Sequence, residues 1–164
     1  MKQPKIYDNF FDENIHQEIF TKLMRPNWGV SGGVSKKPEI YWHYDGLEKE
    51  EYFREYIYNK ICSKLGMSFG GVKRIYANGQ TAGQCGTPHV DDGDLTFLYY
   101  PSPSWSVNWQ GHLLFLDHND EVYNIVEHKA NRAVLFSAKI KHFAEAPSRF
   151  FNGLRISLAY KLWR

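Results

Sequence analysis

The part of the chain that follows Gly70 is a succession of short strand-like segments, and this pattern limits the possible folds more than any other feature. Each segment is rich in aliphatic, β-branched and aromatic residues, and turn-favouring Gly, Pro, Asn and Asp residues separate the segments. In chain order they are VKRIYA, LTFLYY, HLLFL, EVYNIVE, AVLFS, KHFAEA and LRISLAYKLW. A series of short strands favours a sandwich or a barrel, because such folds close their own sheet edges.

The first third of the chain shows helical periodicity instead. Apolar side chains recur every four positions from Phe11 to Leu23, Asp12 is placed to cap this segment, and Pro26 is placed to end it. A second helix is expected over residues 47–65, where apolar residues recur at the same spacing. We therefore expect a mainly β fold in which two N-terminal helices pack against the outer face of one sheet.

The length of 164 residues fits one domain. Within residues 1–164 we expect a helical part at about 8–66 and a β-roll at about 70–164, with no repeat, low-complexity tract or linker. Residues 27–45, between the two expected helices, are rich in Gly and aromatic residues, which suits a hairpin or a mobile flap.

Composition argues against several classes of partner. A net charge of +2 without a Lys/Arg block argues against nucleic acid. The sequence has neither an apolar leader nor a run of about 18 apolar residues, so we expect no membrane span. Two cysteines, Cys62 and Cys85, make no disulfide framework in a chain of this length and indicate a reducing compartment. The expected location is the cytoplasm.

Two histidines and a carboxylate form a candidate metal site. His89 and Asp91 are two positions apart, so in an extended segment both side chains project from one face, about 6–7 Å apart at the backbone. His142 would join them from a separate predicted strand. Two imidazoles and one carboxylate on one face of an octahedral ion are typical of non-haem Fe(II), with positions left open for a cosubstrate and O2.

The residues alone leave alternatives open. His112 is a competing ligand at a strand start, whereas His118 and His128 lie in polar turn segments where we expect exposure. Asp92 and Asp94 have the wrong parity or too long a reach. The same ligand set also suits catalytic zinc, so a zinc hydrolase and a non-catalytic metal- or sugar-binding β-roll remain alternatives.

The last predicted strand carries a candidate anion site. Arg155 begins one face of this strand and Ser157 follows on the same face, so the pair would offer a guanidinium fork and a hydroxyl to a carboxylate. The alternative is an edge strand whose polar face lies in water. Tyr100 and Tyr76 are further candidate donors, although core packing is the ordinary role of a tyrosine in a strand.

Together these motifs resemble the Fe(II)- and 2-oxoglutarate-dependent oxygenases, and within them the prolyl hydroxylase branch. The resemblance covers roughly residues 72–163. It rests on IYANGQTAGQCGTPHVDD, TFLYY, WQGHLLFLD, NRAVLFSAKIKHFAEAP and LRISLAYKLW, in this order. It implies a double-stranded β-helix core of the jelly-roll or cupin-like kind. It also implies iron ligands at His89, Asp91 and His142, and 2-oxoglutarate contacts at Arg155, Tyr100 and Tyr76.

The activity that the resemblance implies is hydroxylation of an aliphatic C–H bond with release of succinate and CO2. The implied cofactor set is Fe(II), 2-oxoglutarate as cosubstrate and O2, with ascorbate as a further candidate. A prolyl residue of a protein or peptide is the expected substrate; a free amino acid or another protein side chain is the alternative. Collagen-type enzymes carry Lys at the position of Arg155, which favours the oxygen-sensor-like subgroup, whereas the insert PSRFFNG leaves substrate specificity open.

Overall fold

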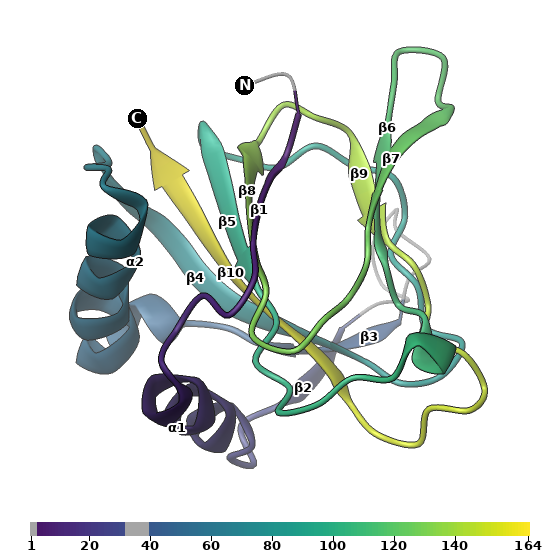
Figure 1. The fold of residues 1–164 in the computed structure, drawn as a ribbon, viewed down its shortest axis with the longest axis horizontal. Coiled ribbons are helices and arrows are strands. Elements are labelled where there is room, and N and C mark those ends of the chain that lie inside the picture. Colours follow the sequence, from purple (N-terminus) through teal and green to yellow (C-terminus); the bar gives the residue numbers. More distant parts are fainter. Residues whose placement is uncertain (1–2, 32–39) are drawn as a thin grey trace.

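The computed structural model describes residues 3–31 and 40–164, and within them two β-sheets face each other with two helices on the outside of the larger sheet (Figure 1). The strands are β1 (Lys5–Tyr7), β2 (Gly29–Ser31), β3 (Tyr41–Tyr44), β4 (Gly71–Gln80), β5 (Leu95–Tyr99), β6 (Leu113–Leu116), β7 (Val122–Val126), β8 (Ala133–Ser137), β9 (His142–Ala144) and β10 (Arg155–Trp163). The helices are α1 (Glu13–Leu23), η1 (Leu47–Lys49), η2 (Tyr52–Ile57), α2 (Tyr58–Leu65) and η3 (Val107–Trp109). All seven predicted strands are present, and the double-stranded β-helix prediction is confirmed.

The larger sheet has the order β1-β8-β5-β10-β4-β3-β2, and the smaller sheet has the order β7-β6-β9. Strand β10 lies between β5 and β4 and is antiparallel to both. Every residue from Arg155 to Leu162 is buried. The alternative of an exposed edge strand is therefore wrong for β10, and its Arg–Ser–Ala–Lys face points into the protein.

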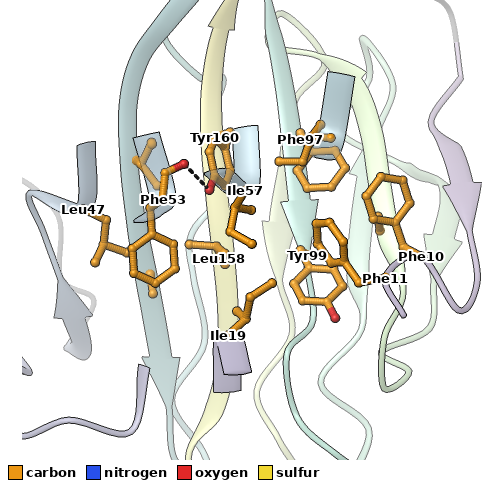
Figure 2. Close-up of a cluster of buried hydrophobic side chains, with 14 of the residues drawn as sticks. Phe10, Phe11, Ile19, Leu47, Phe53, Ile57, Phe97, Tyr99, Leu158 and Tyr160 are labelled. Atoms are coloured by element: carbon orange, nitrogen blue, oxygen red, sulfur yellow. Dashed lines mark hydrogen bonds between the residues drawn. The ribbon is translucent and has the colours of Figure 1, made fainter. Parts of the chain in front are cut away.

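The helices cover the outer face of the larger sheet, as the apolar spacing predicted (Figure 1). Their side chains, including Ile19 and Phe53, share one buried cluster with Leu158 of β10 (Figure 2). Helix α1 begins directly after Asp12, but the Asp12 side chain makes no capping bond; its carboxylate accepts from Lys64 Nζ at 3.2 Å. The predicted single helix over 47–65 is instead a 3₁₀ turn, a π turn and α2. The π turn includes Phe53, whose carbonyl also accepts a hydrogen bond from the Tyr160 hydroxyl at 2.9 Å.

A second, smaller core fills the space between the sheets. It contains Phe115 of β6 and Phe136 of β8, whose rings meet edge to face at 5.1 Å. Strands β2 and β3 pair with each other, which agrees with the hairpin predicted within residues 27–45. The mobile flap was the other prediction for this segment, and its residues 32–39 lie outside the described residues. None of the described helices is long and apolar enough to cross a membrane.

The N-terminal strand is held partly by charge, and this predicts a pH dependence. Arg132 Nε donates to Asp8 at 2.6 Å and Lys129 Nζ lies 3.0 Å away, and the Arg132 hydrogen bond lowers the pKa of Asp8 to about 2. Because the folded pKa is depressed, this stabilisation is complete above the ordinary value of 3.8 and is lost as the pH falls toward 2. Asp8→Asn should lower the free energy of unfolding at pH 7 by at most about 1 kcal/mol, since the group is partly exposed.

Urea unfolding of wild type and Asp8→Asn at pH 7 and pH 2.5 measures this contribution. The difference between the two proteins should shrink at the lower pH. A difference that stays constant between the two pH values would contradict the assignment.

Candidate metal centre and adjoining pocket

His89 and His142 are brought together by the backbone. The amide of His89 donates to the carbonyl of His142 at 3.0 Å, and the amide of His142 donates to that of His89 at 2.9 Å. This isolated antiparallel bridge places the two residues directly opposite each other, and their ring centroids lie 4.6 Å apart. A segment before β5 and the first residue of β9 thus contribute to one site.

Both imidazoles are fixed by hydrogen bonds that they donate to backbone carbonyls. Nδ1 of His89 lies 2.8 Å from the carbonyl of Thr87, and Nδ1 of His142 lies 2.8 Å from that of Ile140. A carbonyl only accepts, so each Nδ1 carries the proton and each Nε2 has a free lone pair. Burial lowers the pKa of His142 to about 4, so this ring is neutral at pH 7. Such outer hydrogen bonds are typical of metal-binding histidines.

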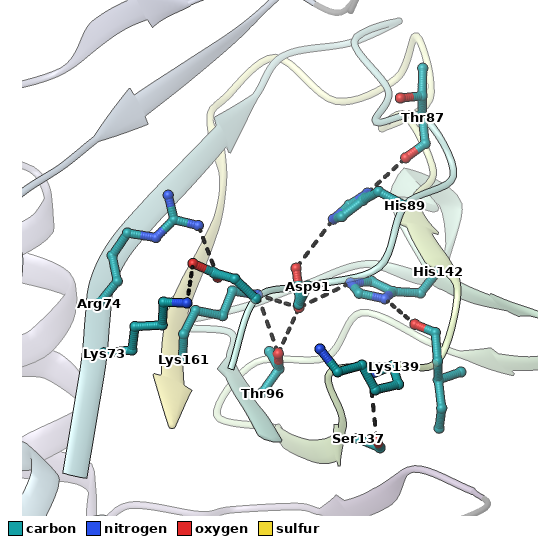
Figure 3. Close-up of polar contacts among 12 residues, drawn as sticks. Lys73, Arg74, Thr87, His89, Asp91, Thr96, Ser137, Lys139, His142 and Lys161 are labelled. Atoms are coloured by element: carbon teal, nitrogen blue, oxygen red, sulfur yellow. Dashed lines mark hydrogen bonds and ion pairs between the residues drawn. The ribbon is translucent and has the colours of Figure 1, made fainter. Parts of the chain in front are cut away.

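Asp91 completes the group (Figure 3). One carboxylate oxygen, Oδ1, lies 3.4 Å from His89 Nε2, and the other, Oδ2, lies 3.4 Å from His142 Nε2. Thr96 also donates to Oδ2 at 2.6 Å, and Lys161 Nζ forms an ion pair with the same oxygen. Burial alone would raise the pKa of Asp91, but the adjacent His89 ring and the Lys161 cation together hold it well below its usual range.

The three side chains offer ligand atoms within 4.8 Å of one another. Two imidazole nitrogens and the Asp91 carboxylate converge, with Oδ1 facing His89, while Thr96 and Lys161 contact Oδ2, the oxygen that faces His142 (Figure 3). This donor set fits a divalent transition metal with open coordination positions.

The other side chains that the sequence suggested as metal ligands have different partners. Asp92 pairs with Lys73 and Arg74, and Asp94 accepts from the Arg164 amide. His112 accepts a hydrogen bond from the His128 amide at 3.3 Å. The expectation that His128 is exposed is wrong: it is 4% exposed, because its ring lies between the rings of Tyr100 and Trp105.

Arg155 is fully buried at 1% exposure beside the triad's pocket. Its Nε donates to the carbonyl of Gly111 at 2.7 Å, and its Nη1 donates to Gln80 Oε1 at 2.7 Å. Gly111 has a φ of +77°, and a Cβ there would lie 2.9 Å from Arg155 Cδ, so only glycine fits this contact. Burial lowers the pKa of Arg155, and the Tyr100 hydroxyl opposes this shift.

A pocket of about 420 Å³ connects the two groups of residues. His89 and Asp91 line it on the metal side, and Ser157 and Gln80 line it on the Arg155 side. Tyr76 also lines the pocket, and burial raises the pKa of its phenol. Gln80 is therefore the link between the pocket and the guanidinium, and its side-chain oxygen occupies an acceptor position that a ligand carboxylate would take.

Tyr100 lies deeper than the pocket lining. The Arg155 Cζ atom is 5.4 Å from the centroid of the Tyr100 ring, and the hydroxyl of Tyr100 is buried. Of the seven predicted site residues, His89, Asp91 and His142 form the triad. Ser157 and Tyr76 line the pocket, and Arg155 shares a strand face with Ser157. Tyr100 lies behind the pocket lining, against Arg155.

Lys161 and Gln80 are site residues that the sequence interpretation missed. The signal for Lys161 was present, because it shares the parity of Arg155 and Ser157 along β10. Gln80 carried no such signal, since the predicted strand VKRIYA ended before it, whereas β4 continues to Gln80 and pairs it with Arg155.

The Lys161–Asp91 ion pair predicts a change in stability. Lys161 is 2% exposed, so Lys161→Met would leave the Asp91 carboxylate buried without its cation. The metal-free protein should lose about 3 kcal/mol of unfolding free energy. Added Mn(II) should raise the melting temperature of the variant by more than that of wild type, because an unneutralised carboxylate attracts a dication more strongly.

Lys73→Met is the matched control, since Lys73 lies 3.4 Å from the half-buried Asp92 at the pocket rim. It should change neither the stability of the metal-free protein nor the Mn(II) response. Wild-type stability of metal-free Lys161→Met would contradict a buried ion pair.

Comparisons with known proteins agree with this fold. No protein-family model matches the chain, and no curated protein matches it. Among solved structures, a prolyl-4-hydroxylase from Pseudomonas putida aligns over 98% of this chain and 92% of its own, with a TM-score of 0.70 and 14% identity. A Trichoplax adhaerens prolyl hydroxylase, in complex with a hypoxia inducible factor peptide fragment, aligns over 98% and 83%, with a TM-score of 0.72 and 14% identity.

A third structure has a different described activity. The non-haem alpha-ketoglutarate-dependent epimerase SnoN from nogalamycin biosynthesis aligns over 96% of this chain and 78% of its own, with a TM-score of 0.71 and 14% identity. At these identities the likeness establishes the shared fold, and function is argued from the site residues.

Proposed function

We propose that this protein is an Fe(II)- and 2-oxoglutarate-dependent oxygenase that hydroxylates an aliphatic C–H bond. One observation carries the proposal: a single pocket joins a His–Asp–His group with free ligand atoms to a buried arginine that is reached through Gln80. Zinc or iron alone would suit the His–Asp–His group, but only an anionic ligand explains the buried arginine. The 2-oxoglutarate molecule has a metal-chelating end and a distal carboxylate, and it therefore fits both.

The chain's residues have distinct tasks in this proposal. His89, Asp91 and His142 would hold the iron through Nε2, one carboxylate oxygen and Nε2. Arg155 would hold the distal carboxylate of 2-oxoglutarate through its guanidinium, with Ser157 and Tyr100 as hydroxyl donors. Nη2 is unpaired and can donate directly, whereas Nη1 becomes available only when the Gln80 side chain, now 2.7 Å away, releases it.

Bound iron would supply the coupling between decarboxylation of 2-oxoglutarate and reduction of O2, with one oxygen atom passing to succinate and the other to the substrate. The protein's own contribution is orientation and charge balance. Lys161 neutralises Asp91 from the side opposite the histidines, and Thr96 fixes the rotation of the carboxylate (Figure 3).

A zinc hydrolase fits the pocket less well. Such an enzyme needs a general base beside the metal. Apart from Asp91, the carboxylates described in the pocket lining are Asp45, 3.4 Å from His43, and Asp92, paired with Lys73 and Arg74. Both carboxylates are therefore already engaged by basic side chains. A hydrolase also has no role for Arg155.

Spectroscopy and product analysis test the oxygenase proposal. Anaerobic protein with Fe(II) and 2-oxoglutarate should develop a weak visible charge-transfer band, and admission of air should then yield succinate. Neither should occur when Zn(II) replaces Fe(II). The proposal would be refuted if no band formed and no succinate appeared.

We propose further that the substrate is a prolyl residue of a protein or peptide. The sequence motifs that resemble prolyl hydroxylases support this, and a structural neighbour is described with a peptide bound. Proline-containing peptides incubated with the loaded enzyme should gain the mass of one oxygen atom. A free amino acid that gains this mass while the peptides do not would replace the peptide substrate with a small molecule.

A further inference from the structure

A group of unpaired polar atoms lies around Arg155. Among the described residues, six buried side-chain atoms have no hydrogen-bond partner. Four of them belong to three neighbouring residues: Nη2 of Arg155, the hydroxyl of Tyr100, and both ring nitrogens of His128. Leaving such an atom buried and unpaired costs about 1–3 kcal/mol. Their concentration in one place indicates a site that a ligand completes.

Aromatic rings hold His128 in place. Its ring stacks on Tyr100 with centroids 4.0 Å apart and on Trp105 at 3.9 Å, and Phe151 supports Trp105 at 4.7 Å. The His128 amide donates to His112 Nδ1, which fixes the backbone as well. The imidazole faces are therefore covered, and only its ring-edge nitrogens are left for a polar partner.

The unpaired atoms are mainly donors. Burial lowers the pKa of His128 far below its usual value, with the Arg155 cation adding to this shift, so the ring is neutral and has one N–H. The guanidinium Nη2, the phenol O–H and this N–H together offer hydrogen bonds to an acceptor. A carboxylate has several lone pairs and the charge that Arg155 requires.

We propose that His128 is a further specificity-determining residue of the anion site, whose N–H donates to the distal carboxylate of a 2-oxo diacid beside Arg155 and Tyr100. This inference rests on the proposed function. Sequence pattern did not reveal it, because His128 lies in the polar segment EHKANR. Its role is to favour a 2-oxo diacid over a 2-oxo monoacid, since a monoacid leaves the three donors unpaired.

Ligand binding to the Mn(II)-loaded protein, measured by calorimetry, tests this without turnover. The two ligands are 2-oxoglutarate and 2-oxobutyrate, which lacks the distal carboxylate. His128→Phe retains an aromatic ring between Tyr100 and Trp105 but removes both nitrogens. We expect it to weaken 2-oxoglutarate binding by about tenfold or more, the effect of one hydrogen bond to a charged group, and to leave 2-oxobutyrate binding unchanged.

Thermal stability is the second measurement, and unlike 2-oxoglutarate affinity it should not fall in His128→Phe. Because His128→Phe removes two unpaired buried nitrogens, its melting temperature should equal or exceed that of wild type. His16→Phe is the matched control: His16 is also buried, but its Nδ1 lies 2.5 Å from the Tyr99 hydroxyl. That variant should have a lower melting temperature and unchanged affinity for both acids.

Four results would overturn the inference. Equal weakening of both acids by His128→Phe would mean that the histidine only packs, and no weakening of either would mean that it makes no ligand contact. His128→Gln, which restores an N–H donor, should discriminate between the acids better than His128→Phe, and equal discrimination would count against it. If wild type binds Mn(II) but not 2-oxoglutarate, the proposed function itself fails, and with it this role.

Discussion

Replacement of Asp91 by alanine is expected to weaken divalent metal binding by more than a hundredfold and to abolish turnover. Asp91 is the anionic member of the group, and its removal leaves two neutral imidazoles facing Lys161, whose cation then has no counter-charge. The lost attraction and the new repulsion act in the same direction. Loss of a direct metal ligand should exceed the roughly 10–100-fold effect of losing a residue that only hydrogen-bonds to a ligand.

Calorimetric titration with Mn(II) measures this effect, and circular dichroism tests whether the fold survives. The fold should survive with lower stability, because Asp91 belongs to neither hydrophobic core but its removal leaves Lys161 buried without its counter-charge. Asp92→Ala is the matched control, because the neighbouring carboxylate pairs with Lys73 and Arg74 at the pocket rim. It should bind Mn(II) as wild type does. Full metal binding by Asp91→Ala, or its loss in Asp92→Ala, would refute the ligand assignment.

Replacement of Arg155 by alanine should weaken 2-oxoglutarate binding and leave metal binding nearly unchanged. We expect 2-oxoglutarate binding to weaken by about a hundredfold, which corresponds to the roughly 2–5 kcal/mol of a buried, hydrogen-bonded charge pair. Mn(II) binding should stay within a few-fold of wild type, because Arg155 contacts Gly111 and Gln80 and no member of the triad. Arg155→Lys should retain part of the affinity, since it keeps the charge but loses the planar fork.

The rival anchor for a carboxylate is Arg74, which lines the same pocket. Its guanidinium already pairs with Asp92 at 3.4 Å, so Arg74→Ala should leave 2-oxoglutarate affinity unchanged. Titration of the three variants with 2-oxoglutarate after Mn(II) loading decides between the two arginines. Loss of affinity in Arg74→Ala with none in Arg155→Ala would place the anion at the pocket rim. Equal loss of metal and 2-oxoglutarate in Arg155→Ala would make that residue structural.

Much of the fold followed from local patterns. Alternation of side chains predicted β5 and β10 closely, and the four-residue spacing from Phe11 to Leu23 predicted α1. These signals are local, because the spacing at which side chains return to the same face depends only on the helix or strand that contains them. The short strand β1 was missed, since Lys5–Tyr7 has too few residues to show a period and is held by pairing with β8.

The candidate site also has some features that the sequence determined and others that only the tertiary structure decided. The sequence by itself determined that His89 and Asp91 share a face and that Arg155, Ser157 and Lys161 share another, because parity along an extended segment is fixed by the backbone. Tertiary structure alone decided that His142 lies opposite His89, that Lys161 neutralises Asp91 and that His128 is buried near Arg155. These contacts depend on strand register and on packing between distant segments, which no local period encodes.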